Sequence, residues 1–384
     1  MNNKYYIALQ LMGINNNIII EIMKCFNKNE LKKLFEGDIL ELSFKYNIRI
    51  DKYIEKFNDK LYINKIIKRS EDVIRKNKEL KIKTILYTSK QYPDRLKIIK
   101  DPPAIIYLKG RNILKHDLKS VACIGTRTPT TFGVNAIKSI VKNLVNEQFT
   151  IISGLAEGVD ELVHKICLEN NGRTIAVLAH GLDIIYPKKN EGLANHILEK
   201  GGTLLSEFPV GTKIEKFMFV NRNRIVSALS KGVVMIEAKQ KSGTRHTVNF
   251  AIEQNKPIFC PVFTSFSIYS GLNLELIKEK KATTINGNDD YVKIISELGY
   301  KIKYDKKAIC KIKKNSMNEL LNNKIIFEEK DLLNEIDLDK FATFKTEKDK
   351  YLKFKSILKD KDLTLKEFFN LIIDKVISEN SKER

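Results

Sequence analysis

At 384 residues the chain is long enough for two or three domains, so at least one sizeable hydrophobic core can form. No segment reaches the roughly 18 to 20 apolar residues of a membrane span, and the first residues lack the pattern of a secretory signal, so we expect a cytoplasmic protein without membrane contact. The 68 Lys+Arg residues outnumber the 47 Asp+Glu residues and leave a net charge of +21. This surplus favours a polyanionic partner, although a chain rich in Lys, Asn and Ile can also arise from biased coding composition.

Metal sites and common catalytic motifs are missing from the sequence. The cysteines stand singly at Cys25, Cys123, Cys167, Cys260 and Cys310, without the spacing of a zinc site, so we expect reduced, mostly packed thiols. The histidines are dispersed, and no H-E-x-x-H, G-x-S-x-G or P-loop string occurs. We therefore predict no catalytic residue, no metal and no cofactor.

Residues 1–80 are predicted to form a small helical domain. Apolar residues recur with helical spacing at Ile18–Met23 and Leu31–Phe35, and a lysine-rich helical stretch follows at about Lys60–Leu80. Beyond it, short strand candidates at Thr84–Tyr87 and Ile105–Leu108 flank prolines that fix extended backbone. We expect this segment to be a connector that packs on the next domain.

From Ser120 onward, short β-branched runs alternate with helical stretches, which is typical of a parallel sheet covered by helices on both faces. The expected strands are Val121–Ile124, Thr150–Ile152, Thr174–Leu178, Thr203–Leu205, Val233–Ile236 and Ile258–Pro261. The expected crossover helices are Phe132–Glu147, Asp160–Asn170, Asn190–Lys200, Arg222–Ser230 and Thr247–Asn255. Right-handed crossovers then favour an α/β fold, with a Rossmann-like, doubly wound and mostly parallel sheet over residues 81–290.

The pattern changes again after Gly287. Residues 291–384 are rich in lysine and asparagine, and their apolar periodicity is strongest at Leu363–Ile377. We expect a mostly helical C-terminal tail there, whose role the sequence leaves unassigned.

The turns after the predicted strands share glycines and small hydroxyl residues. They are Gly125-Thr126-Arg127, Ser153–Gly158, His180–Asp183, Ser206–Pro209 and Ser242–Arg245. Ligands of a doubly wound sheet bind beyond the carboxyl ends of its strands, where glycines allow close approach and helix N-termini present amides to phosphate. Each turn alone is more simply an ordinary connection, but their coincidence at one edge predicts an anion site.

Cations and aromatic rings accompany these turns. Arg127, Lys216, Arg222, Arg224 and Arg245 can supply charge to phosphates, and the arginines can also bind in a planar, forked geometry. Phe217 and Phe219 can stack on unpaired bases, although core packing is an equally good interpretation of both. For Ser153 and Ser242 the simpler interpretation is helix capping.

Four polar side chains near the strand ends have plainer interpretations than catalysis. His164 lies midway along a predicted helix and is expected to be a packing histidine. Asp160, Asp183 and Glu207 are expected to orient loops by accepting hydrogen bonds from backbone amides.

In this order, the strings resemble the bacterial DNA-processing protein A (DprA/Smf) family. The match runs from Tyr92-Pro93 and Asp101-Pro102-Pro103, through Gly125–Arg127, Ser153–Asp160, Gly181–Pro187, Ser206–Pro209, Asn221–Ile225 and Ser242–Thr244, to Ser270–Asn273. It covers roughly residues 85–287. The N-terminal helical module is similar in character to the SAM-like (sterile-alpha-motif-like) extension of that family.

The resemblance implies a protein that binds single-stranded DNA at the carboxyl edge of the sheet, forms a homodimer through the Rossmann-like domain and helps to load the RecA recombinase, with no catalytic turnover. Taken with the strand-end turns, it gives these predicted DNA-binding residues: Gly125, Thr126, Arg127, Ser153, Gly154, Lys216, Phe219, Arg222, Asn223, Arg224, Ser242, Gly243, Thr244 and Arg245.

The sequence also departs from that family. Glu157 stands where a basic residue is frequent, Arg245 stands where an apolar one is frequent, and no winged-helix module is recognisable in residues 301–384. A rival hypothesis is a nucleotide-binding sensor or nucleotide phosphoribohydrolase that uses the same cleft, since Ser242–Arg245 is followed by a helix bearing Glu253. Against it, that turn lacks paired glycines.

Overall fold

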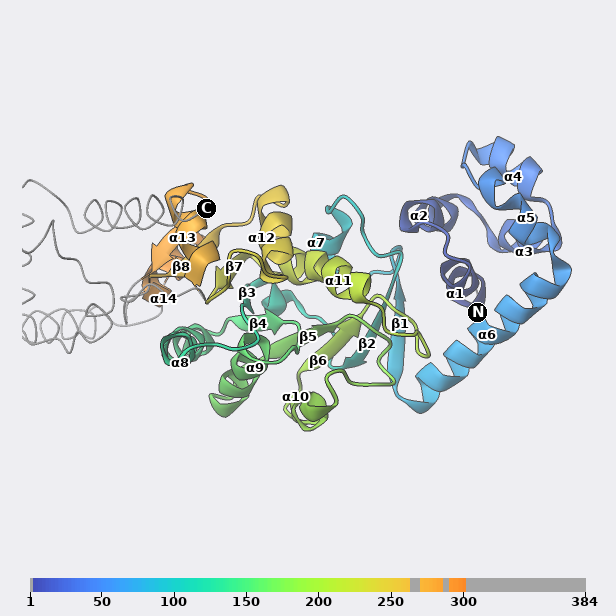
Figure 1. Ribbon diagram of the computed structural model, residues 1–384. Coiled ribbons are helices and arrows are strands. Elements are labelled where there is room, and N and C mark those ends of the chain that lie inside the picture. Colours follow the sequence, from blue (N-terminus) through green and yellow to red (C-terminus); the bar gives the residue numbers. More distant parts are fainter. Residues whose placement is uncertain (1–2, 263–269, 286–289, 302–384) are drawn as a thin grey trace, which may run out of the picture.

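The computed structural model describes residues 3–262, 270–285 and 290–301, and these residues form one nine-stranded sheet (Figure 1). The strands are β1 (Ile82–Leu86), β2 (Ile105–Gly110), β3 (Ser120–Ile124), β4 (Thr150–Ser153), β5 (Thr174–Leu178), β6 (Thr203–Ser206), β7 (Gly232–Met235), β8 (Ile258–Pro261) and β9 (Thr283–Ile285). Their order is β1-β2-β6-β5-β4-β3-β7-β8-β9. All neighbours from β6 to β9 pair in parallel, while β2 is antiparallel to both β1 and β6. The prediction of a mostly parallel α/β sheet is confirmed.

Helices cover both faces of this sheet (Figure 1). One face carries α8 (Thr131–Asn146), α9 (Val159–Glu169) and α10 (Glu191–Glu199), and the other carries α7 (Asp94–Lys97), α11 (Lys216–Leu229) and α12 (Thr244–Glu253). A further helix, α13 (Gly271–Lys278), packs with the second group, and short 3-10 turns lie at Lys115–Leu118 and Lys188–Asn190. The buried strands read as continuous apolar runs because both of their faces are covered.

Two helices begin earlier than the sequence predicts. The start of α11 is Lys216 rather than Arg222, and the start of α12 is Thr244 rather than Thr247. At neither start does the N-cap residue, Glu215 or Gly243, make a side-chain cap hydrogen bond. The usual polar signal of a helix start is therefore missing from both segments.

The segment expected to be a connector belongs to the sheet itself. Strand β2 pairs with β6 over Tyr107–Gly110, and β1 pairs with β2 over its whole length. Tyr107 is fully buried there. The segment thus extends the sheet by two strands at the edge that faces the N-terminal helices (Figure 1).

The N-terminal helices form a module against that edge. They are α1 (Asn3–Leu11), α2 (Asn16–Cys25), α3 (Lys28–Glu36), α4 (Ile39–Tyr46), α5 (Ile54–Asn58) and α6 (Lys60–Glu79), with a 3-10 turn at Asp51–Tyr53. Their apolar side chains share one cluster with Tyr107 and Leu178 of the sheet domain. The predicted helical module is present, and its core is continuous with that of the sheet.

The last described helix, α14 (Asp290–Glu297), packs against α8. Ile294, Ile295 and Leu298 are buried in the same cluster as residues of α8 and α9. The sheet domain therefore continues past the expected boundary at residue 290. Of the tail expected at 291–384, residues 302–384, with Leu363–Ile377, lie outside the described residues. Where the structure describes the chain, no helix has both the length and the apolar character to cross a membrane.

Candidate nucleic-acid interface

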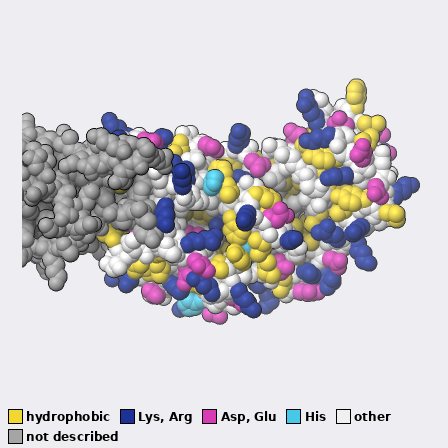
Figure 2. Space-filling model, in the orientation of Figure 1, with side chains coloured by type: hydrophobic (Ala, Val, Ile, Leu, Met, Phe, Trp, Pro, Cys, Tyr) yellow, Lys and Arg dark blue, Asp and Glu magenta, His cyan; other side chains and the backbone are white. Residues whose placement is uncertain are grey.

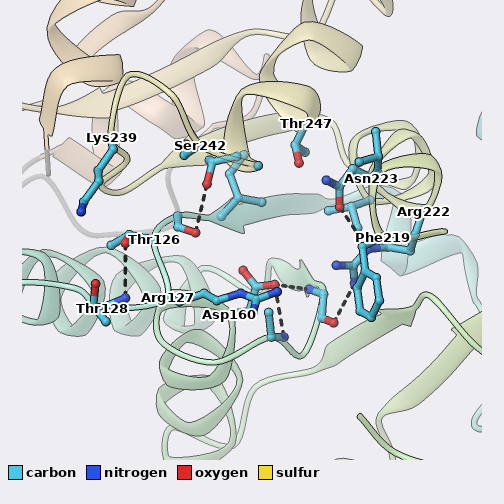
Figure 3. A pocket seen from close by; sticks show the side chains of 18 residues that line it. Thr126, Arg127, Thr128, Asp160, Phe219, Arg222, Asn223, Lys239, Ser242 and Thr247 are labelled. Atoms are coloured by element: carbon cyan, nitrogen blue, oxygen red, sulfur yellow. Dashed lines mark hydrogen bonds between the residues drawn. The ribbon is translucent and has the colours of Figure 1, made fainter. Parts of the chain in front are cut away.

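A pocket lies where the strand order of the sheet reverses direction. From β3 the chain proceeds through β4, β5 and β6 on one side, whereas β7, β8 and β9 lie on the other. The carboxyl ends of β3, β4 and β7 and one side of α11 enclose a cavity of about 390 Å³ (Figure 3). This switch point is the usual ligand position in a doubly wound sheet. The lining is formed by Ile124, Gly125, Thr126, Arg127, Thr128, Gly154, Ala156, Asp160, Phe219, Val220, Arg222, Asn223, Val226, Lys239, Ser242, Gly243, Thr244 and Thr247.

The turn after β3 brings an exposed cation to the pocket. The amide of Thr126 donates to the Glu237 carbonyl at 2.7 Å, which fixes this turn against the end of β7. Arg127 is exposed, has no ion-pair partner within the described residues, and extends along the pocket toward Asp160 (Figure 3). A side chain on Gly158 would overlap the Arg127 backbone, and Gly158 has a φ of +80°, so glycine is needed for this approach.

The turn after β4 is held by a buried carboxylate. Asp160 Oδ2 accepts hydrogen bonds from the amides of Gly154 at 3.2 Å and Ala156 at 3.4 Å, which confirms its expected role in orienting the loop. Burial raises the pKa of Asp160, and the nearby Arg222 opposes that shift. The Asp160 carboxylate therefore holds the loop after β4 in place through hydrogen bonds to the loop amides.

Arg222 forms the floor of the pocket. Its Nη1 donates to the Gly154 carbonyl at 2.6 Å and to the Val177 carbonyl, and its Nε donates to Asn223 Oδ1 at 3.1 Å. Any side chain on Gly154 would overlap this guanidinium. Burial lowers the pKa of Arg222, Asp160 raises it, and Arg127 lowers it further. The floor therefore carries a buried cation solvated by carbonyls, which adds positive potential beneath a ligand.

The turn after β7 presents the start of α12 to the pocket. Thr244 Oγ1 donates to the Gly125 carbonyl at 3.1 Å and joins the β3 and β7 turns. Ser242 does not cap the helix: the N-cap is Gly243, and the Ser242 hydroxyl has no hydrogen-bond partner within the described residues. A helix N-terminus without a side-chain cap, next to a hydroxyl without a partner, is suited to hold an anion.

Helix α11 adds aromatic and amide groups. Phe219 and Asn223 line the pocket one turn apart, and Phe217 is half exposed, so neither phenylalanine is a core residue. Lys216 lies outside the lining, exposed at the first position of the helix. It precedes Phe219 by three residues and so lies on the same side of the helix.

The structure corrects the expected position of Arg224. This residue is buried outside the pocket, where its Nη1 and Nη2 donate to the two carboxylate oxygens of Glu207 at 2.8 and 2.6 Å, and its Nε donates to the Asp101 carbonyl at 2.9 Å. Burial lowers its pKa, but Glu207, Asp101 and Tyr92 together raise it, and the net shift is upward. Since residues two apart on a helix point in nearly opposite directions, Arg222 and Arg224 cannot face the same pocket.

Glu207 is the centre of a junction rather than a loop-orienting group. Besides Arg224, its carboxylate accepts a hydrogen bond from Asn16 Nδ2 at 2.9 Å, and its carbonyl accepts one from Gln10 Nε2 at 2.9 Å. Asn16 also accepts the Ala104 amide at 3.1 Å. Three of the family-like strings, around Asp101, Glu207 and Arg224, thus tie the N-terminal helices to the sheet.

Two other predicted residues also lie outside the lining. Arg245 donates from both Nη atoms to Glu275, at 2.6 and 2.7 Å, and is thereby engaged beside α13. Ser153 is buried, and its hydroxyl donates to the Cys123 carbonyl at 2.7 Å, linking β4 to β3. Both side chains therefore hold neighbouring elements together and do not line the pocket.

The expectations for His164 and Asp183 were met, and one lining residue was missed. His164 is a packing histidine, buried with its Nδ1 2.7 Å from Thr174 Oγ1, and Asp183 orients a loop by accepting the Gly211 amide at 3.0 Å. Lys239 lines the pocket and was missed, although its place shortly after β7 was a usable signal. No cluster of three His, Cys, Asp or Glu side chains able to hold a metal occurs in the described part of the chain.

Fold and site together define a Rossmann-like α/β protein with a cationic pocket at the switch point of its sheet. The chain belongs to the DNA recombination-mediator protein A family, whose model matches residues 83–296. It is thereby a member of a family of DNA-processing proteins.

Sequence relatives and solved structures agree with this assignment. The chain is 40% identical over 202 residues to the DNA processing protein DprA of Bacillus subtilis, covering 53% of this chain and 68% of that protein. It is 31% identical over 287 residues to DprA of Streptococcus pneumoniae, covering 73% of this chain and 94% of that protein. The crystal structure of the Streptococcus pneumoniae protein superposes with a TM-score of 0.60 at 26% identity, covering 79% of this chain and 99% of the other.

A second structure is that of DNA processing protein A from Helicobacter pylori, described for its single-stranded DNA binding mode. It superposes with a TM-score of 0.51 at 29% identity, covering 57% of this chain and 97% of the other.

Proposed function

We propose that this protein binds single-stranded DNA in the switch-point pocket. The observation that carries the proposal is that an exposed arginine, Arg127, and the uncapped start of α12 line the same pocket. In this proposal a phosphate group binds the Arg127 guanidinium and the free amides at the start of α12. A base can stack on Phe219, which lines the pocket beside Asn223.

The charge of the molecule supports the same ligand. Lysine and arginine side chains are spread widely over the face drawn in Figure 2, and the whole chain carries +21. Phosphate neutralisation then supplies most of the affinity, which makes binding steeply dependent on salt and weakly dependent on base sequence.

Three finer parts of the proposal rest on family membership. The bound strand is handed to the RecA recombinase, two copies associate through the sheet domain, and the protein acts in the cytoplasm on recombining or incoming DNA. We propose no chemical turnover. Light scattering measures the association of copies, and RecA filament assembly on a coated strand, with and without this protein, measures the transfer.

A nucleotide-binding sensor or nucleotide phosphoribohydrolase is the alternative. A pocket of about 390 Å³ is large enough for a mononucleotide, and it contains the carboxylate of Asp160. The hydrogen bonds of Asp160 to two loop amides weigh against its use as a catalytic group.

Fluorescence anisotropy with labelled single- and double-stranded oligonucleotides across a salt series tests the proposal. We expect tighter binding of single strands, with an affinity that falls steeply as salt rises. Equal and weak binding of both forms would contradict it. If a mononucleotide displaces the strand when added at a concentration equal to that of the protein, the nucleotide-binding alternative gains support.

A further inference from the structure

A group of apolar side chains is exposed beside the pocket. Tyr186 is 47% exposed and Ile184 is 43% exposed in the loop after β5, and Phe219 in the first turn of α11 is partly exposed. The Tyr186 ring meets that of Phe219 edge to face, with centroids 5.7 Å apart. We call Tyr186 and Phe219 the aromatic surface, whereas Phe217, two residues before Phe219 on α11, points to the opposite side of the helix. Figure 2 shows hydrophobic side chains gathered in the middle of the face drawn, with lysines and arginines around them. Such exposed patches typically mark binding sites.

The loop that carries Tyr186 is held in place by hydrogen bonds. The Tyr186 amide donates to His180 Nε2 at 3.3 Å. Burial lowers the pKa of His180, so its ring is neutral and Nε2 can accept. At the other end of the loop, Asn190 Nδ2 donates to the Leu155 carbonyl at 3.0 Å. A ring held in this way loses little conformational freedom on binding, which favours its use as a contact surface.

The aromatic surface is continuous with the pocket. Phe219 lines the pocket and also contacts Tyr186, so the rings extend outward from the proposed base position. Lys188, Lys213 and Lys216 lie on or next to the same two segments, are exposed, and form no ion pair with other described residues. Rings flanked by such cations match a chain of phosphates and unpaired bases better than an apolar protein partner.

We propose that the aromatic surface stacks the bases of the single strand that leaves the pocket. The inference rests on the proposed function, because it needs a strand in the pocket. It adds Tyr186 as a contact and gives the strand a direction, from the switch point toward the carboxyl ends of β5 and β6. The site size on DNA is then larger than the pocket alone.

The absence of tryptophan from the whole chain provides a direct reporter. In a Tyr186→Trp variant all tryptophan emission comes from the proposed surface, and a base stacked on the indole quenches it. The matched control is Phe44→Trp, since Phe44 is 93% exposed on α4 of the N-terminal module, away from the pocket. Both variants are titrated with an oligothymidylate while anisotropy of a labelled strand records binding.

We expect the indole emission of the Tyr186→Trp variant to be quenched and to saturate together with the anisotropy change, while the emission of the Phe44→Trp variant changes little. If a strand binds both variants and quenches the two emissions equally, or quenches neither, the inference is overturned and the pocket proposal stays intact. A strand that binds neither the variants nor the natural protein removes the proposed function, and the inference with it.

A second pair of variants separates stacking from folding. Tyr186→Ala removes the ring and should weaken binding of a long oligothymidylate by about tenfold, while Tyr186→Phe keeps the ring and should bind normally. Equal losses in both variants would contradict stacking. If Tyr186→Asp converts a dimer into a monomer while DNA affinity per protomer is unchanged, the surface joins copies of the chain and the inference is overturned.

Discussion

Arg127 and Arg224 both stand in family-like strings, yet the structure uses them in opposite ways. Arg127 lies exposed on the pocket and has no ion-pair partner within the described residues, whereas Arg224 is buried and pairs with both oxygens of Glu207. The first is available to a ligand and the second is used by the fold. A string of residues shared with a family therefore mixes contacts to DNA with contacts that assemble the domain.

The largest expected effect is a loss of stability when Arg224, the arginine used by the fold, is removed. Arg224→Ala leaves the Glu207 carboxylate buried and unpaired, and we expect a loss of about 3–5 kcal/mol in the free energy of unfolding. Urea denaturation measures it. The double variant Arg224→Ala with Glu207→Ala should lose less than the sum of the two single variants, because both charges are then gone. A loss below about 1 kcal/mol would show that the Arg224–Glu207 ion pair contributes little to the stability of the fold.

The next effect is a pH dependence of stability caused by His164, which is buried in α9. Thr174 Oγ1 donates to the Ile151 carbonyl at 2.8 Å, so it accepts the Nδ1 proton of His164, and His164 Nε2 is left buried without a hydrogen-bond partner within the described residues. Burial, with a smaller contribution from Arg222, lowers the pKa of His164 to about 3. Below the ordinary histidine pKa of about 6.5 the unfolded chain binds a proton that the folded chain does not. The free energy of unfolding therefore decreases as the pH is lowered.

Between pH 7 and pH 5 this histidine should remove about 2 kcal/mol from the free energy of unfolding. Urea denaturation at several pH values measures the slope, and a His164→Gln variant serves as the control. The natural protein should lose more stability over this range than the variant. Equal slopes would mean that His164 already takes up a proton in the folded state.

The smallest effect concerns Arg245, which is ion-paired like Arg224 but more exposed to solvent. Its ion pair with Glu275 has side chains that are 34% and 21% exposed, so solvent screens the attraction. We expect Arg245→Ala to cost at most about 1 kcal/mol in thermal denaturation and to leave DNA affinity nearly unchanged. A clear loss of affinity at unchanged stability would move Arg245 into the binding surface.

The sequence predicted the central sheet well, because periodicity and turn residues are local signals. The strands Thr174–Leu178 and Ile258–Pro261 agree with the structure residue for residue. The early starts of α11 and α12 were missed because no capping side chain marks them. The membership of β1 and β2 in the sheet was also missed, since it depends on pairing with β6, far away in the chain.

The site was predictable to the level of turns but not of side-chain direction. Strand-end reasoning placed Gly125, Arg127 and Gly243 at one pocket, and they line it. It could not place Arg224 or Arg245, because their carboxylate partners Glu207 and Glu275 are remote in sequence. Long-range ion pairs of this kind leave no local pattern.

The most direct test of the account compares Arg127→Ala with Arg49→Ala, which removes the same charge from an exposed position in the N-terminal module. Anisotropy of labelled single strands is measured across a salt series, with urea denaturation alongside. We predict weaker binding by Arg127→Ala alone, a salt slope smaller by about 0.7, and stability within about 0.5 kcal/mol of the natural protein. Equal affinity changes in both variants would contradict the account, since DNA would then respond to overall charge and not to the pocket.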